Sequence, residues 1–171
     1  VELLILEAKG KVKEIITSAS RHHHYSDFSD IPAIERLIAM AKGDVKSQVA
    51  RDLAGKALIE IYSDLDPRGV NPALHSMILD EKYLGSIREL AGTIFVTRCT
   101  VNGSLAELSS LFTNERVPAN VVSFARENME KAELSHLTFC LEQVSQGSPS
   151  VFYVKDFAEL ANSGSTDFVK Q

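Results

Sequence analysis

Apolar residues recur at intervals of three and four along almost the whole chain, and this spacing limits the fold more than any other feature of the sequence. Such intervals place side chains along one stripe of an α-helix, whereas a half-buried strand would need strict alternation. The clearest stripe contains Ile87, Leu90, Ala91, Ile94 and Phe95. A second row, at intervals of four, contains Val45, Val49, Leu53, Ala57, Ile61 and Leu65. We therefore predict an all-α chain in which these rows face the core.

Proline, glycine and small polar residues interrupt the helical pattern at several points. Asp30 and Pro32 are typical of a helix start, and Gly43 suits the left-handed residue that follows a helix. Pro67 and Pro72 cannot both continue one helix. The uninterrupted stretches predict eight or nine short helices, over about residues 2–19, 31–42, 45–65, 86–100, 104–112, 121–131, 134–144 and 149–161, with a further short helix within 72–84.

Several small residues have expected roles at the ends or in the interior of these helices. Asp44 and Ser104 are expected to cap the helices that follow them. Gly55 and Gly92 lie inside predicted helices, where glycine costs about 1 kcal/mol relative to alanine. We expect them to allow two helix backbones to approach closely. At Gly85 a break between two helices is the favoured interpretation.

The length of 171 residues fits one globular domain with a single core. We divide it into an N-terminal helix (1–20), a loop with three consecutive histidines (21–30), a helical core domain (31–162) and a frayed tail (163–171). Residues 151–154 also have strand propensity, but the sequence offers no second strand to pair with them. A last helix over 149–161 is therefore preferred.

Short helices joined by short loops leave two architectures open, an irregular α-solenoid and a compact orthogonal helical bundle. A regular array would hold one repeat length. Helix pairs that begin near Ile31, Pro72, Ser104 and Leu134 are separated by about 41, 32 and 30 residues. These unequal spacings favour neither architecture.

One segment resembles a known class of helical repeat. Residues 31–44 have an Ile-Pro start, an aliphatic run and a Gly-Asp turn, and an Ala- and Leu-rich stretch follows over 45–62. This order resembles the armadillo and HEAT repeats over about 35 residues. The resemblance implies antiparallel helix pairs stacked side by side.

The charge balance argues against a nucleic-acid-binding surface. The chain has 18 basic and 23 acidic residues, a net charge of −5, and the acidic excess follows Lys56. A domain that binds phosphates usually carries the opposite sign. The locally basic stretch with Lys9, Lys11, Lys13 and Arg21 keeps this alternative open. Apolar runs such as residues 3–6 are too short to span a membrane.

No residue pattern predicts catalysis or a metal site. Adjacent histidines 22–24 do not form a tetrahedral zinc site by themselves. His75 and His136 are interpreted as lone helix residues without a ligand at i+3 or i+4, and Cys99 and Cys140 as buried apolar residues. Phosphate-loop, dinucleotide and hydrolase motifs are absent from the sequence. We expect no enzyme activity, no cofactor and no metal.

The resulting hypothesis is a helical protein–protein interaction or scaffold domain of a larger protein. It would bind a protein partner and could self-associate through the stripe of Leu134, Leu137, Leu141 and Val144. The alternative is a nucleic-acid-associated helical module of the nucleocapsid or replication-complex type. A third hypothesis is an enzyme whose site is assembled in space from His75 or His136 and a cysteine. We expect an intracellular protein, cytoplasmic or nuclear.

Overall fold

The computed structural model describes residues 1–18, 31–65 and 72–145, and these are helical almost throughout. Its elements are α1 (Glu2–Ser18), α2 (Pro32–Ala39), the π-helical turn η2 (Met40–Asp44), α3 (Gln48–Leu65), α4 (Pro72–Leu79), α5 (Gly85–Asn102), α6 (Leu105–Ser110), α7 (Ala119–Glu127) and α8 (Met129–Ser145). These segments contain no strand. The prediction of an all-α chain is confirmed.

The N-terminal parts of two helices differ from the prediction. Gly43 has a φ of +123° and ends the first predicted core helix in a wide turn, as expected. However, α3 begins at Gln48, after Ser47 rather than after Asp44. The Ser47 Oγ accepts a hydrogen bond from the Ala50 N–H at 3.3 Å, so Ser47 and not Asp44 acts as the cap. Ser104 precedes α6 but makes no capping hydrogen bond through its side chain.

The short helix predicted within residues 72–84 is Pro72–Leu79, and a turn leads from it to Gly85, the first residue of α5. One further helix boundary was predicted wrongly. Helices α7 and α8 meet at Asn128, whose side-chain amide donates to the Phe124 carbonyl at 2.8 Å. The predicted gap around residues 132–133 therefore lies inside α8. The predicted segments 149–161, 21–30 and 163–171 lie outside the described residues.

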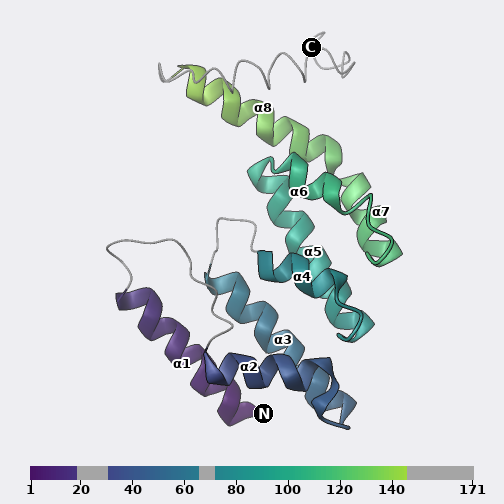
Figure 1. Cartoon of the computed structure of the whole chain (residues 1–171). Coiled ribbons are helices and arrows are strands. Elements are labelled where there is room, and N and C mark those ends of the chain that lie inside the picture. The colour runs from purple at the N-terminus through teal and green to yellow at the C-terminus, as the bar shows by residue number, and fades with distance from the viewer. Residues whose placement is uncertain (19–30, 66–71, 146–171) are drawn as a thin grey trace.

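The helices follow one another in three layers (Figure 1). Layer 1 contains α2, η2 and α3, layer 2 contains α4 and α5, and layer 3 contains α6, α7 and α8. Helix α1 covers layer 1 by packing on α2 and α3. Helix α5 lies between the outer layers, because it contacts α3 on one side and α7 and α8 on the other. Each layer therefore packs mainly on its immediate neighbours.

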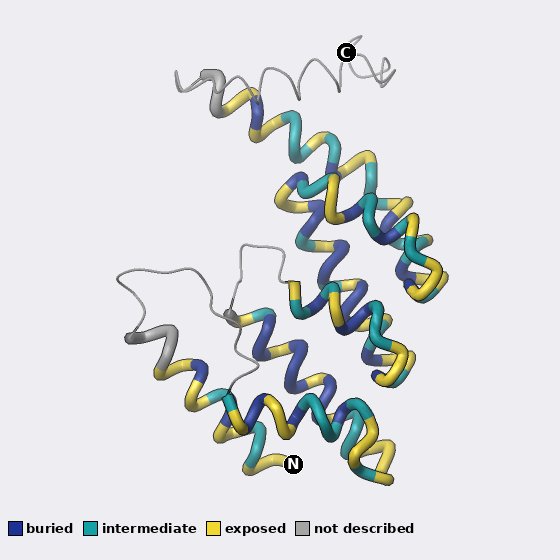
Figure 2. The backbone as a smooth tube through the Cα atoms, viewed as in Figure 1, coloured by how far each residue is buried: buried dark blue, intermediate teal, exposed yellow. Residues whose placement is uncertain are grey.

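Buried residues line the sides on which successive helices meet (Figure 2). The largest fully buried side chains come from all three layers: Ile34, Leu37, Leu58, Ile61, Leu74, Met77, Ile78, Ile87, Phe95, Val96, Leu108 and Leu111. They belong to one cluster of contacting apolar residues. The core therefore continues from layer to layer.

Two five-residue segments occupy corresponding positions in layers 1 and 2. They are Arg51-Asp52-Leu53-Ala54-Gly55 on α3 and Arg88-Glu89-Leu90-Ala91-Gly92 on α5. Their arginines make matching hydrogen bonds. Arg51 donates to the Ala41 carbonyl of its own layer and, at 2.8 Å, to the Lys82 carbonyl of layer 2. Arg88 likewise donates to Ile78 at 2.8 Å and to the Arg116 carbonyl of layer 3.

The glycines of the two segments also match. A Cβ atom on Gly55 would lie 2.8 Å from the Ile87 side chain of layer 2, and one on Gly92 would lie 2.4 Å from Val121 of layer 3. Both glycines therefore permit the close approach of helices that we expected of them. Layer 3 continues the series with Phe124 and Ala125 in the places of leucine and alanine, but not with the arginine or the glycine.

Candidate functional site

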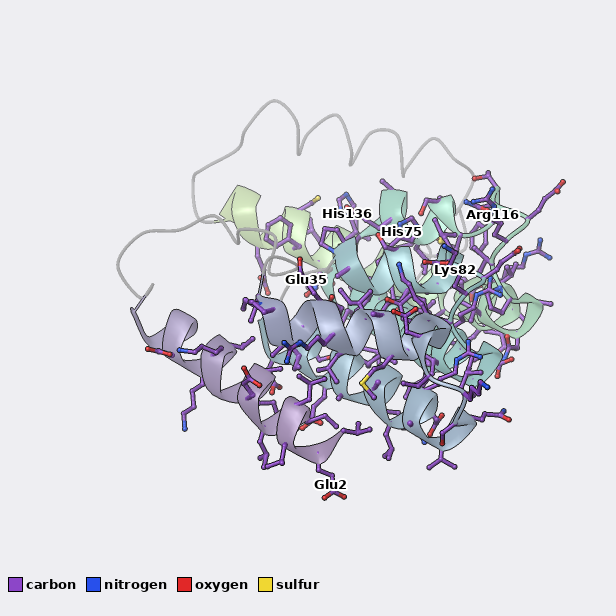
Figure 3. All side chains as sticks on the ribbon, turned by 60° about the horizontal axis from the view of Figure 1, so that its bottom comes forward. Glu2, Glu35, His75, Lys82, Arg116 and His136 are labelled. Atoms are coloured by element: carbon purple, nitrogen blue, oxygen red, sulfur yellow. The ribbon has the colours of Figure 1, made fainter. Side chains whose placement is uncertain are left out.

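His75 is a packing residue of α4 rather than part of a polar site. Its ring stacks on the Phe95 ring with 5.1 Å between centroids, and its Nε2 lies 3.4 Å from the Ser110 Oγ. Burial lowers the pKa of His75 below its ordinary value, because the surroundings disfavour the charged ring. Figure 3 shows His75 on α4 and His136 on α8.

The interpretation of His136 as a lone residue was wrong. Cys140 follows it at i+4, one helical turn further along α8, and its Sγ lies 3.7 Å from the His136 Nε2. However, Cys140 is only 1% exposed. A buried thiol cannot meet a substrate from solvent, so this pair does not form a reactive site.

The other cysteine is also unsuited to nucleophilic chemistry. Cys99 is buried in α5, and burial, with a further contribution from Glu107, raises the pKa of its thiol to about 12. The nucleophilic thiolate is therefore scarce near neutral pH. Both Cys99 and Cys140 are free thiols. Within residues 1–18, 31–65 and 72–145, no three His, Cys, Asp or Glu side chains gather as a metal site would require.

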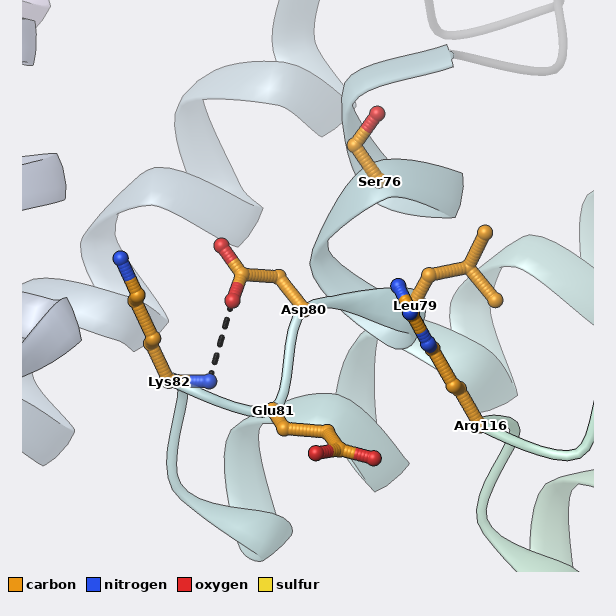
Figure 4. A pocket seen from close by; sticks show the side chains of 6 residues that line it. All are labelled: Ser76, Leu79, Asp80, Glu81, Lys82 and Arg116. Atoms are coloured by element: carbon orange, nitrogen blue, oxygen red, sulfur yellow. Dashed lines mark hydrogen bonds between the residues drawn. The ribbon is translucent and has the colours of Figure 1, made fainter.

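An open pocket of about 650 Å³ lies where the turns of layers 2 and 3 meet. It is lined by Ser76, Leu79, Asp80, Glu81, Lys82 and Arg116, which Figure 4 shows from close by. No histidine lines this pocket, and among the described residues the Ser76 hydroxyl makes no hydrogen bond to the side chain of Asp80, Glu81 or Lys82. The pocket therefore lacks the nucleophile–base pair that hydrolytic catalysis needs.

The Asp80 carboxylate of this pocket is already paired with lysines of the protein. Asp80 accepts hydrogen bonds from the Lys82 N–H at 3.0 Å and from the Lys42 ammonium of layer 1 at 2.8 Å. Burial alone would raise the pKa of Asp80, but these two lysines outweigh it and lower the pKa below its ordinary value. The Lys42 ammonium also lies 5.3 Å from the centre of the Tyr83 ring. These contacts join layer 1 to layer 2.

A series of exposed or half-buried apolar side chains recurs on successive layers. Leu53 of α3 is 42% exposed and Leu90 of α5 is 38% exposed. They hold the same place in the two matching segments, so they project on the same side of the layers. Phe124 of α7 holds this place in layer 3 and is half-buried, and Val49, one turn before Leu53, is 70% exposed. We name Val49, Leu53, Leu90 and Phe124 the leucine face.

Carboxylates border the leucine face. Asp52 directly precedes Leu53, and it pairs with Lys56 at 2.7 Å and lies 3.5 Å from the Ser86 hydroxyl. Glu89 precedes Leu90 in the same way, but Thr93 stands where α3 has Lys56. Among the described residues, the Glu89 carboxylate has neither an ion pair nor a hydrogen bond. The face therefore combines exposed apolar groups with negative charge.

The sequence reasoning assigned Val49 and Leu53 to the core for a definable reason. Residues four apart are turned by about 40° around the helix, so a row at intervals of four drifts by about 200° over twenty residues. Ala57 and Ile61 of the predicted row are buried, but Val49 and Leu53 have rotated into solvent. The recurrence of Arg, an acidic residue, Leu, Ala and Gly was the signal that could have revealed the face.

The predicted stripe on α8 is partly exposed. Leu134 and Leu141 are exposed, Leu137 is half-buried, and the side chain of Val144 lies outside the described part of the chain. Helix α8 buries Ala132 and Cys140 instead. The structure therefore leaves two leucines of this stripe facing away from the core.

Comparison with protein-family models, with curated proteins and with solved structures finds no match to this chain. Among the described helices, none is both long and apolar enough to cross a membrane.

Proposed function

We propose that the chain is an α-helical repeat domain that binds another polypeptide through the leucine face. The proposal rests on which residues of the matching segments in layers 1 and 2 are packed and which are exposed. Their arginines and glycines serve the packing of one layer on the next and their alanines are buried, whereas their leucines remain exposed. Apolar side chains that recur on one exposed side are typical of a binding surface.

The charge around the leucine face supports a protein partner over the nucleic-acid alternative. Glu89 and Glu127, which have no ion pair within the described residues, place negative charge beside the leucine face, where a phosphate backbone would be repelled. The basic residues that kept the alternative open are partly neutralised. Lys9 pairs with Glu60, and Lys11 pairs with Glu14 at 2.9 Å. A polypeptide with apolar side chains suits this face better than RNA or DNA.

Site-specific photo-crosslinking in cells tests the proposal. A photoreactive amino acid at Leu90 is expected to capture a discrete protein, and the capture should be lost when Leu53→Asp is added. Leu6 on α1 is the matched control position, because this leucine is 67% exposed and does not belong to the matching segments. Equal capture from positions 6 and 90, or capture at Leu90 that survives Leu53→Asp, would contradict the proposal.

A further inference from the structure

We propose that the leucine face binds a basic amphipathic helix of the partner, which lies across α3, α5 and α7. This inference rests on the proposed function and adds the chemistry and conformation of the bound segment. It is argued from the charges that border the face, from the polar groups that the face offers, and from the spacing of the layers.

The charge argument starts from the change between layers 1 and 2. On α3 the Asp52 carboxylate has Lys56 as its partner one turn later, at 2.7 Å. The corresponding pair on α5 would be Glu89 with Thr93, and on α7 the same position as Thr93 holds Glu127. Within the described residues, neither Glu89 nor Glu127 has an ion pair. A partner segment with lysine or arginine beside its apolar residues supplies the missing positive charge.

The polar groups near the face favour a helical partner over an extended one. An extended segment needs hydrogen-bond partners for its backbone, whereas a helix pairs its own N–H and C=O groups. The hydroxyls of α5 are already used inside the protein. Ser86 lies 3.5 Å from Asp52, Thr93 donates to the Glu89 carbonyl at 3.0 Å, and Thr97 donates to the Thr93 carbonyl at 2.7 Å. With these hydroxyl donors used and the Glu89 carboxylate able only to accept, the face offers little to pair the C=O groups of an extended segment, whereas a helix laid on it needs no such pairing.

The spacing of the layers sets the pattern that such a helix needs. Packed helices have axes about 8–10 Å apart, and Gly55 and Gly92 allow close packing of α3 on α5 and of α5 on α7. A helix rises about 1.5 Å per residue, so seven residues span about 10.5 Å. Apolar residues at i and i+7 of the partner therefore meet Leu53 and Leu90 in turn. A lysine or arginine of the partner, next to the apolar residue that contacts Leu90, then lies near Glu89.

A synthetic probe tests this chemistry directly. The probe is a fluorescein-labelled peptide of about 18 residues with leucine at the a and d positions of its heptads and lysine and alanine elsewhere. Its binding to the full chain is measured by fluorescence anisotropy. We expect Leu90→Asp to weaken binding by about tenfold or more, as for a central apolar contact. Glu89→Lys is expected to weaken it about fivefold.

Two variants are matched controls. Leu6→Asp makes the same substitution at an exposed leucine on α1, and Glu115→Lys makes the same charge change at an exposed residue between α6 and α7. Neither should alter the affinity for the lysine peptide. A second peptide with glutamate in place of lysine is expected to bind Glu89→Lys better than the unsubstituted chain. Circular dichroism confirms that each variant retains its helices.

The possible failures separate the two proposals. Absence of binding by the lysine peptide, or equal binding by all variants, would overturn the inference of a basic helix. Equal affinity of the lysine and glutamate peptides, with both still dependent on Leu90, would also overturn it but would support the leucine face as a binding surface. The photo-crosslinking result at Leu90 judges the proposed function independently of either peptide.

Discussion

At the scale of single residues, the two matching segments show that residues close together in sequence can differ in role, with some packed between layers and others exposed. Arg88 donates to carbonyls of layers 2 and 3, Gly92 lies against Val121, and Leu90 between them is exposed. Successive residues of a helix point about 100° apart, so positions so close in sequence can face different surroundings. The requirement for glycine at residue 92 is steric, because its backbone is helical and a Cβ would overlap Val121.

The steric role of Gly92 predicts opposite effects of two glycine-to-alanine substitutions. In Gly92→Ala the new Cβ would lie 2.4 Å from Val121, so we expect a loss of about 1–3 kcal/mol in the free energy of unfolding. In Gly10→Ala on α1 the new Cβ would meet nothing within 4 Å, and the gain in helix propensity should stabilise the chain by about 0.5–1 kcal/mol. Urea unfolding followed by circular dichroism measures both. Destabilisation by both substitutions to the same extent would contradict the steric explanation.

At the scale of elements, the sequence predicted the existence of helices better than their ends. The spacing at Ile87, Ala91 and Phe95 identified α5, because these residues are buried on one stripe. The boundary between α7 and α8 could not be predicted in the same way. Asn128 breaks the helix by donating its side-chain amide to the Phe124 carbonyl, and no proline or glycine marks the place. Helix ends depend on such single hydrogen bonds, which apolar periodicity does not reveal.

The contacts between elements predict that Arg88 is needed for its geometry as well as for its charge. Lysine keeps the charge, but its donors share one nitrogen and cannot reproduce the separate bonds from Nε to the Ile78 carbonyl of layer 2 and from Nη2 to the Arg116 carbonyl of layer 3. We expect Arg88→Lys to lower the free energy of unfolding by about 1.5–3 kcal/mol. The control is Arg36→Lys, since Arg36 is exposed on α2 and its side chain makes no hydrogen bond with a described residue. Chemical denaturation measures both variants, and equal stability of the two would contradict this role of Arg88.

At the scale of the whole molecule, the sequence left a solenoid and a bundle equally open. The reason is that the positions of the helix starts and the matching segments inside the helices give different spacings. Helix starts are unevenly spaced because the turns differ in length, such as the wide turn at Met40–Asp44. The recurring order lies instead inside the long helices, in the contacts of Arg51 and Arg88 with the next layer. The leucine face depends on this arrangement, because Leu53 and Leu90 come from different layers. Side chains on one helix alone could not have predicted it.

Packing between neighbouring layers predicts that damage at one end of the molecule stays local. Gly43 and Gly103 are the glycines with positive φ among the described residues, and they lie in layer 1 and at the end of α5. Alanine is strained by about 1–2 kcal/mol in this conformation. In Gly103→Ala the Cβ would also lie 2.5 Å from the His136 backbone of α8.

Hydrogen exchange measured by mass spectrometry distinguishes local from global destabilisation. Gly103→Ala is expected to speed exchange about tenfold or more in α8 and the adjoining end of α5, and to leave α1 and α2 unchanged. Gly43→Ala is expected to speed exchange in α1 and α2 and to leave α8 unchanged. Gly43 lies in layer 1, and α1 and α2 pack on each other and on α3. These opposite patterns follow if each layer is stabilised chiefly by its neighbours. Faster exchange along the entire chain in both variants would show instead that the three layers unfold as one unit.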